Sequence, residues 1–448
     1  MIPDQSFLTY SLRGTIHGEP IARIMAEAIH AVEPDEVVRR SVSCTGDTLS
    51  VGGRDYDLSG YEHVHLLGIG KASIGMTRAL IEIIGSHLTG GLVITKDAQG
   101  SLQSPIVTLQ GGHPIPDENS LIAGSKVIEY VSSLGAKDLL FCLISGGGSA
   151  LMTAPVEGVS LADMQSLLSS LLACGARIDE INTMRRHLDR LKGGGLVKLA
   201  NGATIVSLIL SDVVGNPLEA IASGPTAPDP TTRADALSVI GQYELQNKVP
   251  GTILACLETA PETPKPGDEL FKTVQNIIIG SNLEAAQAAL TQASMEGFNP
   301  YLLRTDQQGD IREVAFELST FLRQTSRTGD PVTRPACIVV GGETTVIVNG
   351  KGKGGRNTEL ALAAVRELAA FPYVMLITLA TDGEDGTTDA AGAVVTGDTF
   401  QRAADMGLYG EEYLEQNDSY SFFAALDDLL KPGPTGTNVN DLIFLLIF

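Results

Sequence analysis

The sequence predicts an α/β protein of two domains, and three observations support this fold class. The chain has 448 residues, which is two to three times the length of an average domain. Its apolar runs are short, and most of them lead through Gly or Ser into helical periodicity, which is typical of a parallel sheet flanked by helices. A content of 43% hydrophobic and 19% charged residues excludes intrinsic disorder and a coiled coil.

Apolar runs of strand length mark the expected sheets. These runs are residues 63–67, 91–95, 138–144, 204–210, 276–279, 336–340, 373–379 and 442–448. Ligands of open α/β sheets bind beyond the carboxyl ends of the strands. The loops that follow these runs are therefore where functional residues are expected.

The boundary between the domains is expected near residue 265. The proline-rich segment 259–268 resists both helix and interior strand, so it indicates a linker or a surface crossover. Segment 325–335 is a second candidate. We expect an N-terminal domain of residues 1–265 and a smaller C-terminal domain of residues 266–448, and a repeated crossing of the chain between them stays open.

Charge and cysteine content narrow the classes of partner and compartment. The chain has 31 Lys and Arg against 53 Asp and Glu, and its net charge of −22 argues against binding to nucleic acid or an anionic membrane. Its five cysteines are widely spaced and form no CxxC pair, which favours reduced thiols. The start of the chain does not resemble a signal peptide, and no apolar run reaches 18 residues. We expect a cytoplasmic protein.

Two glycine-rich loops follow predicted strands and are typical of anion binding. In the first, Gly68 and Gly70 precede Lys71 at the start of a helix, where free amides favour negative charge. An ordinary exposed lysine is the competing interpretation. The second loop contains Ser145, Gly146, Gly147, Gly148 and Ser149 and forms a cradle rich in hydrogen-bond donors, although a tight turn would use the same glycines.

A cationic segment and an aspartate come next. Arg185 and Lys192 belong to a group of basic residues between 182 and 195 that suits a carboxylate or a phosphate, while a solvated helix face is the alternative. Asp212 follows the strand 204–210, where it could bind Mg²⁺ or accept a proton from a substrate hydroxyl. A plain helix N-cap is the competing interpretation for this aspartate.

The C-terminal part carries three further loops of this kind. Glu343 lies in the first, and the run 350–359 gathers glycines, two lysines and Arg356 before a helix, as a polyphosphate site would. Segment 381–389 contains four acids, which suggest a divalent metal but not in EF-hand spacing.

Together these motifs resemble the class II glycerate kinases, a family with a MOFRL C-terminal domain in which some members are labelled hydroxypyruvate reductase. The matching stretches, in the family's order, are GIGKAS at 68–73, GGHPIPDENS at 111–120, SGGGSAL at 145–151, SDVVGN at 211–216, SGPTAPDPTT at 223–232, GGETTV at 341–346, KGGRNTELAL at 353–362, TDGEDGTTDAAGA at 381–393 and TNVNDL at 437–442.

The resemblance implies a Rossmann-like N-terminal domain, a smaller α/β MOFRL-type C-terminal domain, and ATP- and Mg²⁺-dependent phosphorylation of D-glycerate at the 2-hydroxyl in the cleft between them. It places the family's catalytic lysine and arginine at Lys71 and Arg356, and Asp212 then orients or deprotonates the hydroxyl. It leaves a homodimer open. The expected ATP- and substrate-binding residues are Gly68, Gly70, Ser145, Gly146, Gly147, Gly148, Ser149, Arg185, Lys192, Glu343, Gly354, Gly355, Asn357 and Thr381. The expected metal ligands are Asp212, Asp382 and Asp385.

This chain departs from the family pattern at several positions. The family usually has Asp at the position of Asn216, Arg at Gly195 and Ser at Asp189. The change at Asn216 removes a metal ligand or base, and the change at Gly195 is expected to loosen substrate specificity.

Two other functions compete with a kinase. A hydroxypyruvate reductase dependent on NAD(P)H would use the early GxG, but it leaves the SGGGS, GKGKGGRN and TDGEDG loops without a role. A phosphate-ligand sensor without catalysis would keep the anion loops but would need neither Asp212 nor the acidic loop.

Overall fold

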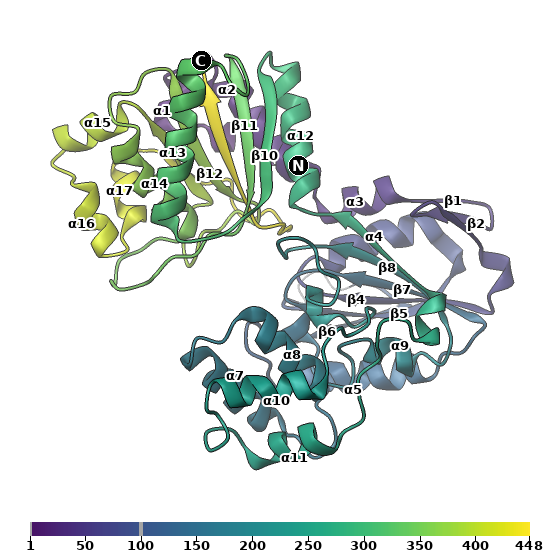
Figure 1. Ribbon diagram of the computed structural model, residues 1–448. Helices are drawn as coiled ribbons and strands as arrows, with labels where there is room; N and C mark the ends of the chain where they lie inside the picture. Colours follow the sequence, from purple (N-terminus) through teal and green to yellow (C-terminus); the bar gives the residue numbers. More distant parts are fainter. Residues whose placement is uncertain (1, 98–101) are drawn as a thin grey trace. The chain divides into compact units, whose positions relative to one another are not determined.

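The computed structural model describes residues 2–97 and 102–448 (Figure 1). Contacts within the chain divide it into unit 1, Met1–Glu33 with Gly280–Phe448, and unit 2, Pro34–Ile279. This division differs from the boundary predicted at residue 265. Residues 2–33 join the C-terminal unit because helix α2 (Gly18–His30) packs on helix α12 (Asn282–Met295). Segment 259–268 stays within unit 2, where the Pro264 carbonyl accepts from the Asp229 amide at 2.9 Å.

Unit 2 is built around a six-stranded sheet in the order β6-β5-β4-β7-β8-β9. The recorded pairs β6–β5, β5–β4, β4–β7 and β7–β8 are all parallel, which confirms the predicted Rossmann-like parallel sheet. Its strands are β4 (His63–Ile69), β5 (Leu88–Thr95), β6 (Ile106–Gln110), β7 (Asp138–Ile144), β8 (Thr204–Leu210) and β9 (Val274–Gly280). A small antiparallel sheet of β1 (Val42–Thr45), β2 (Thr48–Val51) and β3 (Arg54–Asp57) precedes it.

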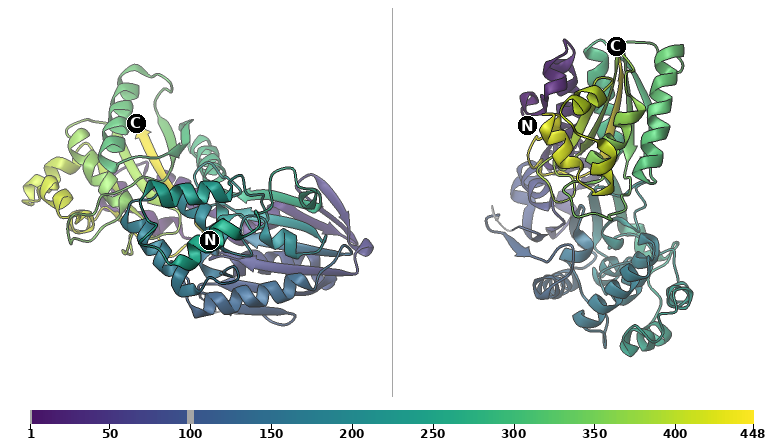
Figure 2. Two further views of the ribbon diagram at one scale, coloured as in Figure 1. Left: turned by 60° about the horizontal axis from the view of Figure 1, so that its bottom comes forward. Right: turned by 90° about the vertical axis from the view of Figure 1, so that its left-hand side faces the viewer.

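The helices of unit 2 form two groups. Those that follow or flank the sheet strands are α3 (Pro34–Ser41), α4 (Ser73–Ile84), α5 (Glu118–Ser132), α6 (Gly148–Leu151) and α9 (Gly195–Leu199). The others are α7 (Leu161–Ala173), α8 (Ile178–Leu188), α10 (Arg233–Gln242) and α11 (Gly251–Thr259). This second group has an apolar core of its own, which includes Leu171, Met184 and Ile253, and it comes to the front in the left view of Figure 2.

Unit 1 contains a mixed six-stranded sheet in the order β10-β11-β15-β12-β13-β14. Its strands are β10 (Asn299–Gln307), β11 (Ala336–Gly342), β12 (Val374–Ala380), β13 (Gly392–Thr396), β14 (Leu429–Leu430) and β15 (Asp441–Ile447). Strand β15 lies antiparallel between β11 and β12. Its amino end therefore meets the carboxyl ends of both neighbours.

Helices cover both faces of this sheet, as Figure 1 shows. One face packs against α13 (Ile311–Thr328) and α14 (Arg356–Glu367), and the alternating residues 336, 338 and 340 of β11 belong to that core. Helix α12 (Asn282–Met295) packs on β10 and β11, and α2 (Gly18–His30) packs on α12. The remaining helices are α1 (Tyr10–Arg13), α15 (Thr399–Asp405), α16 (Gly410–Glu415) and α17 (Ser419–Ala425).

All eight predicted runs form strands. The short or half-exposed strands β1, β2, β3, β6, β10, β13 and β14 were not predicted, because they lack a long apolar run. Among the described residues, no helix is long and apolar enough to cross a membrane.

Candidate active site

The predicted loops of unit 2 meet because their strands are neighbours in the sheet. Strands β4, β7 and β8 lie side by side, so the segments after Ile69, Ile144 and Leu210 share one edge. The amide of Ser145 donates to the Ile69 carbonyl at 2.9 Å, and the amide of Lys71 donates to the Gly146 carbonyl at 3.0 Å. The first two glycine-rich loops therefore form one structure.

Two glycines allow this close approach. Gly70 has a φ of +121°, and a β-carbon there would lie 2.3 Å from the Ser145 hydroxyl oxygen. A β-carbon on Gly146 would lie 2.0 Å from a carboxylate oxygen of Asp212. The carboxylate of Asp212 thus packs against the backbone of the second loop, beside the groups that were predicted to act with it.

Lys71 is an exposed cation in the same loop cluster as the backbone amides of Gly146 and Gly147. Across residues 2–97 and 102–448, its ammonium has no carboxylate within 4.0 Å, although the chain carries a net charge of −22. In the same part of the chain, no backbone acceptor is hydrogen-bonded to the amides of Gly146 and Gly147. A lysine and free amides in one loop cluster form a locally positive site, as an anionic ligand requires.

His113 also belongs to this site, and sequence reasoning missed it. A β-carbon on Gly147 would lie 3.0 Å from Cδ2 of His113 and 3.4 Å from Cγ of Lys71, so the three residues meet. Burial, together with the charges of Lys71 and Lys96, lowers the pKa of His113 to about 4. The ring is therefore neutral near pH 7 and offers one donor and one acceptor without added charge. The GGHPIPDENS stretch contains this histidine, but strand β6, which ends three residues before it, was not predicted from the sequence.

Arg185 is a mostly buried basic residue of the 182–195 segment and is placed to bind a ligand. Its side chain lines a small cavity of about 30 Å³ together with Ser149. Within the described ranges its guanidinium makes no side-chain hydrogen bond or ion pair, and burial lowers its pKa while Asp189 opposes that effect. A buried cation without a direct counter-ion is costly, so the arrangement favours an anionic ligand.

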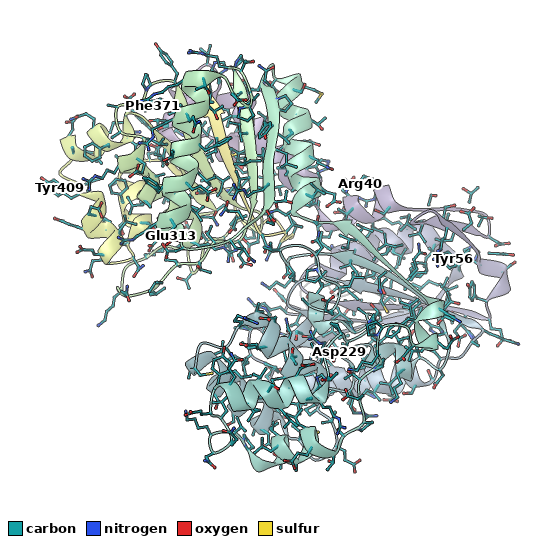
Figure 3. All side chains as sticks on the ribbon, viewed as in Figure 1. Arg40, Tyr56, Asp229, Glu313, Phe371 and Tyr409 are labelled. Carbon is teal, nitrogen blue, oxygen red and sulfur yellow. The ribbon has the colours of Figure 1, made fainter. Side chains whose placement is uncertain are left out.

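The other predicted cations of this segment are engaged within the protein. Buried Lys192 forms an ion pair with Asp189 at 2.7 Å. Its ammonium is therefore already neutralised and is less suited to the predicted ligand contact. Arg186 donates to Asp229 at 2.8 Å inside unit 2, where Figure 3 labels the aspartate. These pairs hold the loops in place.

The backbone conformation is informative at two of the positions that depart from the family pattern. A β-carbon on Gly195 would lie 2.2 Å from the Arg190 carbonyl oxygen, so this position has no room for a side chain. Its glycine is therefore a packing requirement in this chain, and the expected effect on specificity stays a prediction. Asn216 has a φ of +54°, a left-handed conformation that asparagine tolerates better than most residues.

In unit 1, Arg356 joins three strand ends. Its Nε and Nη2 donate to the two carboxylate oxygens of Asp441 at 2.5 and 3.2 Å, and Nη1 donates to Glu343 at 2.7 Å. Asp441 is paired with Gly342 of β11 and with Ala380 of β12, so the antiparallel insertion of β15 delivers it to this point. Sequence reasoning missed Asp441, although the TNVNDL motif contains it.

The charges at this junction are strongly coupled. Burial opposes the charge of Arg356, but Asp441 and Glu343 outweigh burial and raise the pKa of the guanidinium. Burial also raises the pKa of Glu343, and the nearby charges of Asp441 and Asp382 add to that rise. The junction is therefore an acidic cluster held together by one arginine.

The glycine run 350–355 is engaged differently from its prediction. The amides of Gly350 and Lys353 donate to the side chains of Asn417 and Asp418, and the amide of Gly352 donates to the Gln416 carbonyl. A β-carbon on Gly354 would lie 2.3 Å from the Ser419 hydroxyl oxygen. The glycines permit close packing on segment 416–419, and the amides named here are not available to a polyphosphate.

The side chain of Asp385 caps the N-terminus of helix α14. Its carboxylate accepts from the amides of Asn357 and Thr358 at 3.0 and 2.8 Å, and from the Thr358 hydroxyl at 2.8 Å. Burial raises its pKa to about 6 against the effect of these donors. The amide of Gly355 donates to Thr358 at 3.1 Å. The N-terminus of this helix, where Gly355 and Asn357 were expected to bind a ligand, is thus occupied by the protein's own groups.

The two remaining predicted residues of segment 381–389, Thr381 and Asp382, have different surroundings. The Thr381 hydroxyl donates to the Asn440 carbonyl at 2.6 Å and accepts from the Val439 amide at 2.9 Å, so it joins two loops. Asp382 accepts from the Glu384 amide at 3.2 Å and stays near Glu343. In the described part of the chain, the predicted metal ligands form no cluster of three side chains.

Comparison with known proteins gives consistent matches over nearly the whole chain. The profile described as a domain of unknown function, DUF4147, matches residues 21–258, and the MOFRL family profile matches residues 336–441. D-glycerate 2-kinase of Thermotoga maritima is 39% identical over 95% of this chain and 97% of its own. A putative hydroxypyruvate reductase of Agrobacterium vitis is 40% identical over 85% and 86%. The crystal structure of glycerate kinase from Thermotoga maritima superposes with a TM-score of 0.85 at 37% identity, over 95% of this chain and 98% of the other.

Proposed function

The chain belongs to the glycerate kinases that combine a DUF4147 and a MOFRL domain, and from this premise we propose that it transfers the γ-phosphoryl group of ATP to the 2-hydroxyl of D-glycerate. The products are 2-phosphoglycerate and ADP. The observation that carries this proposal is the ammonium of Lys71, which has no ion pair within residues 2–97 and 102–448. It belongs to the same loop cluster as the amides of Gly146 and Gly147, which bond to no backbone acceptor in those ranges. Such donors stabilise the negative charge of a transferring phosphoryl group.

Arg185 is the proposed partner of the glycerate carboxylate. Its planar guanidinium matches a carboxylate with two parallel hydrogen bonds, and it has no ion pair with the described side chains. Ser149 lines the same cavity, and its hydroxyl lies 2.8 Å from that of Ser223. These hydroxyls suit the hydroxyl groups of a small polar substrate.

Asp212 is the proposed base. Its carboxylate lies against Gly146, next to the loop in which Lys71 and the free amides gather. In this role it accepts the proton of the attacking hydroxyl, while Lys71 donates to a phosphoryl oxygen. His113 is a neutral neighbour of Lys71, so it offers hydrogen bonds to the phosphates without repelling the ammonium.

Arg356 is the proposed catalytic residue of unit 1. Three of its five N–H groups donate to Asp441 and Glu343, so one remains on each terminal nitrogen. Its side chain is 32% exposed. The carboxylates fix the direction of the guanidinium, and the remaining N–H groups can meet a phosphoryl oxygen.

The donor set also fits Mg²⁺ in part. Carboxylate oxygens such as those of Asp212 and Asp382 are the hard ligands that Mg²⁺ prefers, whereas both oxygens of Asp385 already accept hydrogen bonds from α14. Bound with ATP, the ion neutralises charge on the phosphates. Asp212 is the proposed metal ligand of unit 2 and Asp382 that of unit 1, and we withdraw Asp385.

The test is product analysis with the purified chain. We expect ADP release and a single new phosphomonoester, identified as 2-phosphoglycerate by phosphorus NMR, when ATP, Mg²⁺ and D-glycerate are all present. Omission of glycerate is the control. A product phosphorylated at the 3-hydroxyl would refute the regiochemistry, and oxidation of NADH by hydroxypyruvate without ADP release would favour the reductase.

A further inference from the structure

Two histidines and an aspartate gather at the edge of the unit 2 sheet that faces away from the glycine-rich loops. His63 and Asp138 are the first residues of β4 and β7, and His65 lies two positions along β4. The glycine-rich loops follow the last residues of the same strands. Six residues of strand separate the two edges, which corresponds to about 20 Å at 3.3 Å per residue. The proposed kinase chemistry does not use this cluster.

The parallel sheet places the three side chains on one face. Side chains alternate along a strand, so His63 and His65 point to the same side. His63 is the direct partner of Asp138 in the β4–β7 register. One ligand atom from each of the three residues lies within 4.8 Å of the others, and this is the only such group of three among the described residues.

The separation of two of these atoms matches a shared metal ion. Nδ1 of His63 lies 3.1 Å from Oδ1 of Asp138. Two ligands at about 2.0 to 2.2 Å from one ion lie about 2.8 to 3.6 Å apart in octahedral or tetrahedral geometry. The third ligand, on His65, lies within 4.8 Å of both of these atoms.

Partners outside the group orient two of its members. Nδ1 of His65 lies 2.7 Å from the Tyr130 hydroxyl. With its proton on Nδ1, this ring donates to Tyr130 and leaves Nε2 as the nitrogen with a lone pair, which is the arrangement that metal-binding histidines commonly show. The amide of Gly135 donates to Oδ2 of Asp138 at 2.8 Å, which leaves Oδ1 on the side of His63.

The site is accessible, and its charges suit a cation. The three side chains line an open hollow of about 680 Å³. Lys137, the nearest ammonium on the rim, forms an ion pair with Glu62.

We propose that His63, His65 and Asp138 bind one divalent ion of the zinc class. Two imidazoles and one carboxylate favour Zn²⁺ over Mg²⁺ or Ca²⁺, which prefer oxygen ligands, and water completes the coordination from the hollow. The bound ion links β4 to β7 and, through Tyr130, to helix α5. The site stabilises unit 2 independently of phosphoryl transfer.

The test is a titration of the metal-free full chain with Zn²⁺ by calorimetry, in excess Mg²⁺ and without nucleotide. Excess Mg²⁺ occupies oxygen-only sites. We expect one equivalent of Zn²⁺ to bind, with a rise of about 5 °C in melting temperature at a hundredfold excess over Kd. Replacement of Zn²⁺ by Co²⁺ should give the visible absorption of a nitrogen-ligated ion.

Three variants make the result specific. His63→Gln and His65→Gln should each weaken Zn²⁺ binding by about tenfold to a hundredfold or more and remove the rise in melting temperature, while the Mg²⁺-dependent kinase rate is retained. His63 is more than half exposed, so its variant is expected to fold. His87→Gln is the matched control, because His87 lies on the same unit outside the group. Equal Zn²⁺ binding by wild type and both site variants, loss of binding in His87→Gln alone, or no binding by the wild type would overturn the proposal.

Discussion

Replacement of Arg356 by lysine separates a catalytic arginine from a structural one. Lysine keeps the charge but loses the planar fork, so it can replace only one of the three hydrogen bonds to Asp441 and Glu343. The side chain of Asp441 is 7% exposed and would keep its charge without its bidentate partner.

The magnitude follows from these contacts. Two charge-assisted hydrogen bonds are lost, each contributing about 1.5 to 3 kcal/mol in well-buried settings. Because Arg356 is 32% exposed, solvent screens part of this energy, and we expect Arg356→Lys to destabilise the fold by about 2 kcal/mol. For a unit of this size, the melting temperature should fall by about 4 to 8 °C.

Kinetics give the second part of the prediction. If the remaining N–H groups meet charge that develops on the phosphoryl group, kcat falls by about a hundredfold to a thousandfold, while the KM for glycerate changes only a few-fold. Steady-state kinetics and a thermal melt of the same preparation measure both effects. Arg366→Lys on the same helix is the matched control, since Arg366 is 74% exposed and pairs with Glu411 at 3.4 Å. A normal kcat together with a lowered melting temperature would make Arg356 structural only, and unchanged values of both would refute the reasoning.

Three further predictions concern unit 2. Lys71→Met should lower kcat by about a hundredfold to a thousandfold. The melting temperature should stay within about 1 °C of wild type, because Lys71 has no ion pair among the described residues. Exposed Lys126→Met is the control, and a large loss of stability would contradict the reasoning. Arg185→Gln should raise the KM for glycerate by about tenfold to a hundredfold. It should also raise the melting temperature, because it removes a buried charge. An equal change of KM in exposed Arg190→Gln would refute a specific role of Arg185. For His113, the unfolded chain binds a proton between pH 6.5 and about 4 that the folded chain does not, so this group makes stability fall as the pH is lowered through that window. His113→Gln should flatten this part of the curve of unfolding free energy against pH, and an unchanged slope would show that the histidine does not titrate there.

Local sequence patterns were sufficient for the main strands and for the unit 2 loops. An apolar run that ends in glycine is a property of a few consecutive residues, and the parallel order of the sheet then brings such loops to one edge. The division into units was less predictable. It depends on packing between α2 and α12, which are more than 250 positions apart in the chain, so no local signal near residue 265 could reveal it.

The sequence by itself determined which residue types follow the strands, such as Lys71 and Asp212, and that Arg356 begins a helix. Only the tertiary structure decided which of the predicted charges are available. Lys192 and Arg185 look alike in the sequence, yet Asp189 neutralises the first and leaves the second without a direct ion pair. Asp385 was predicted as a metal ligand, but its carboxylate caps helix α14. Asp441 was not predicted, yet the antiparallel strand β15 places it beside Arg356. The reason is physical: the cost of a buried charge is set by the partners that surround it in space, and a strand inserted from the far end of the chain can supply those partners.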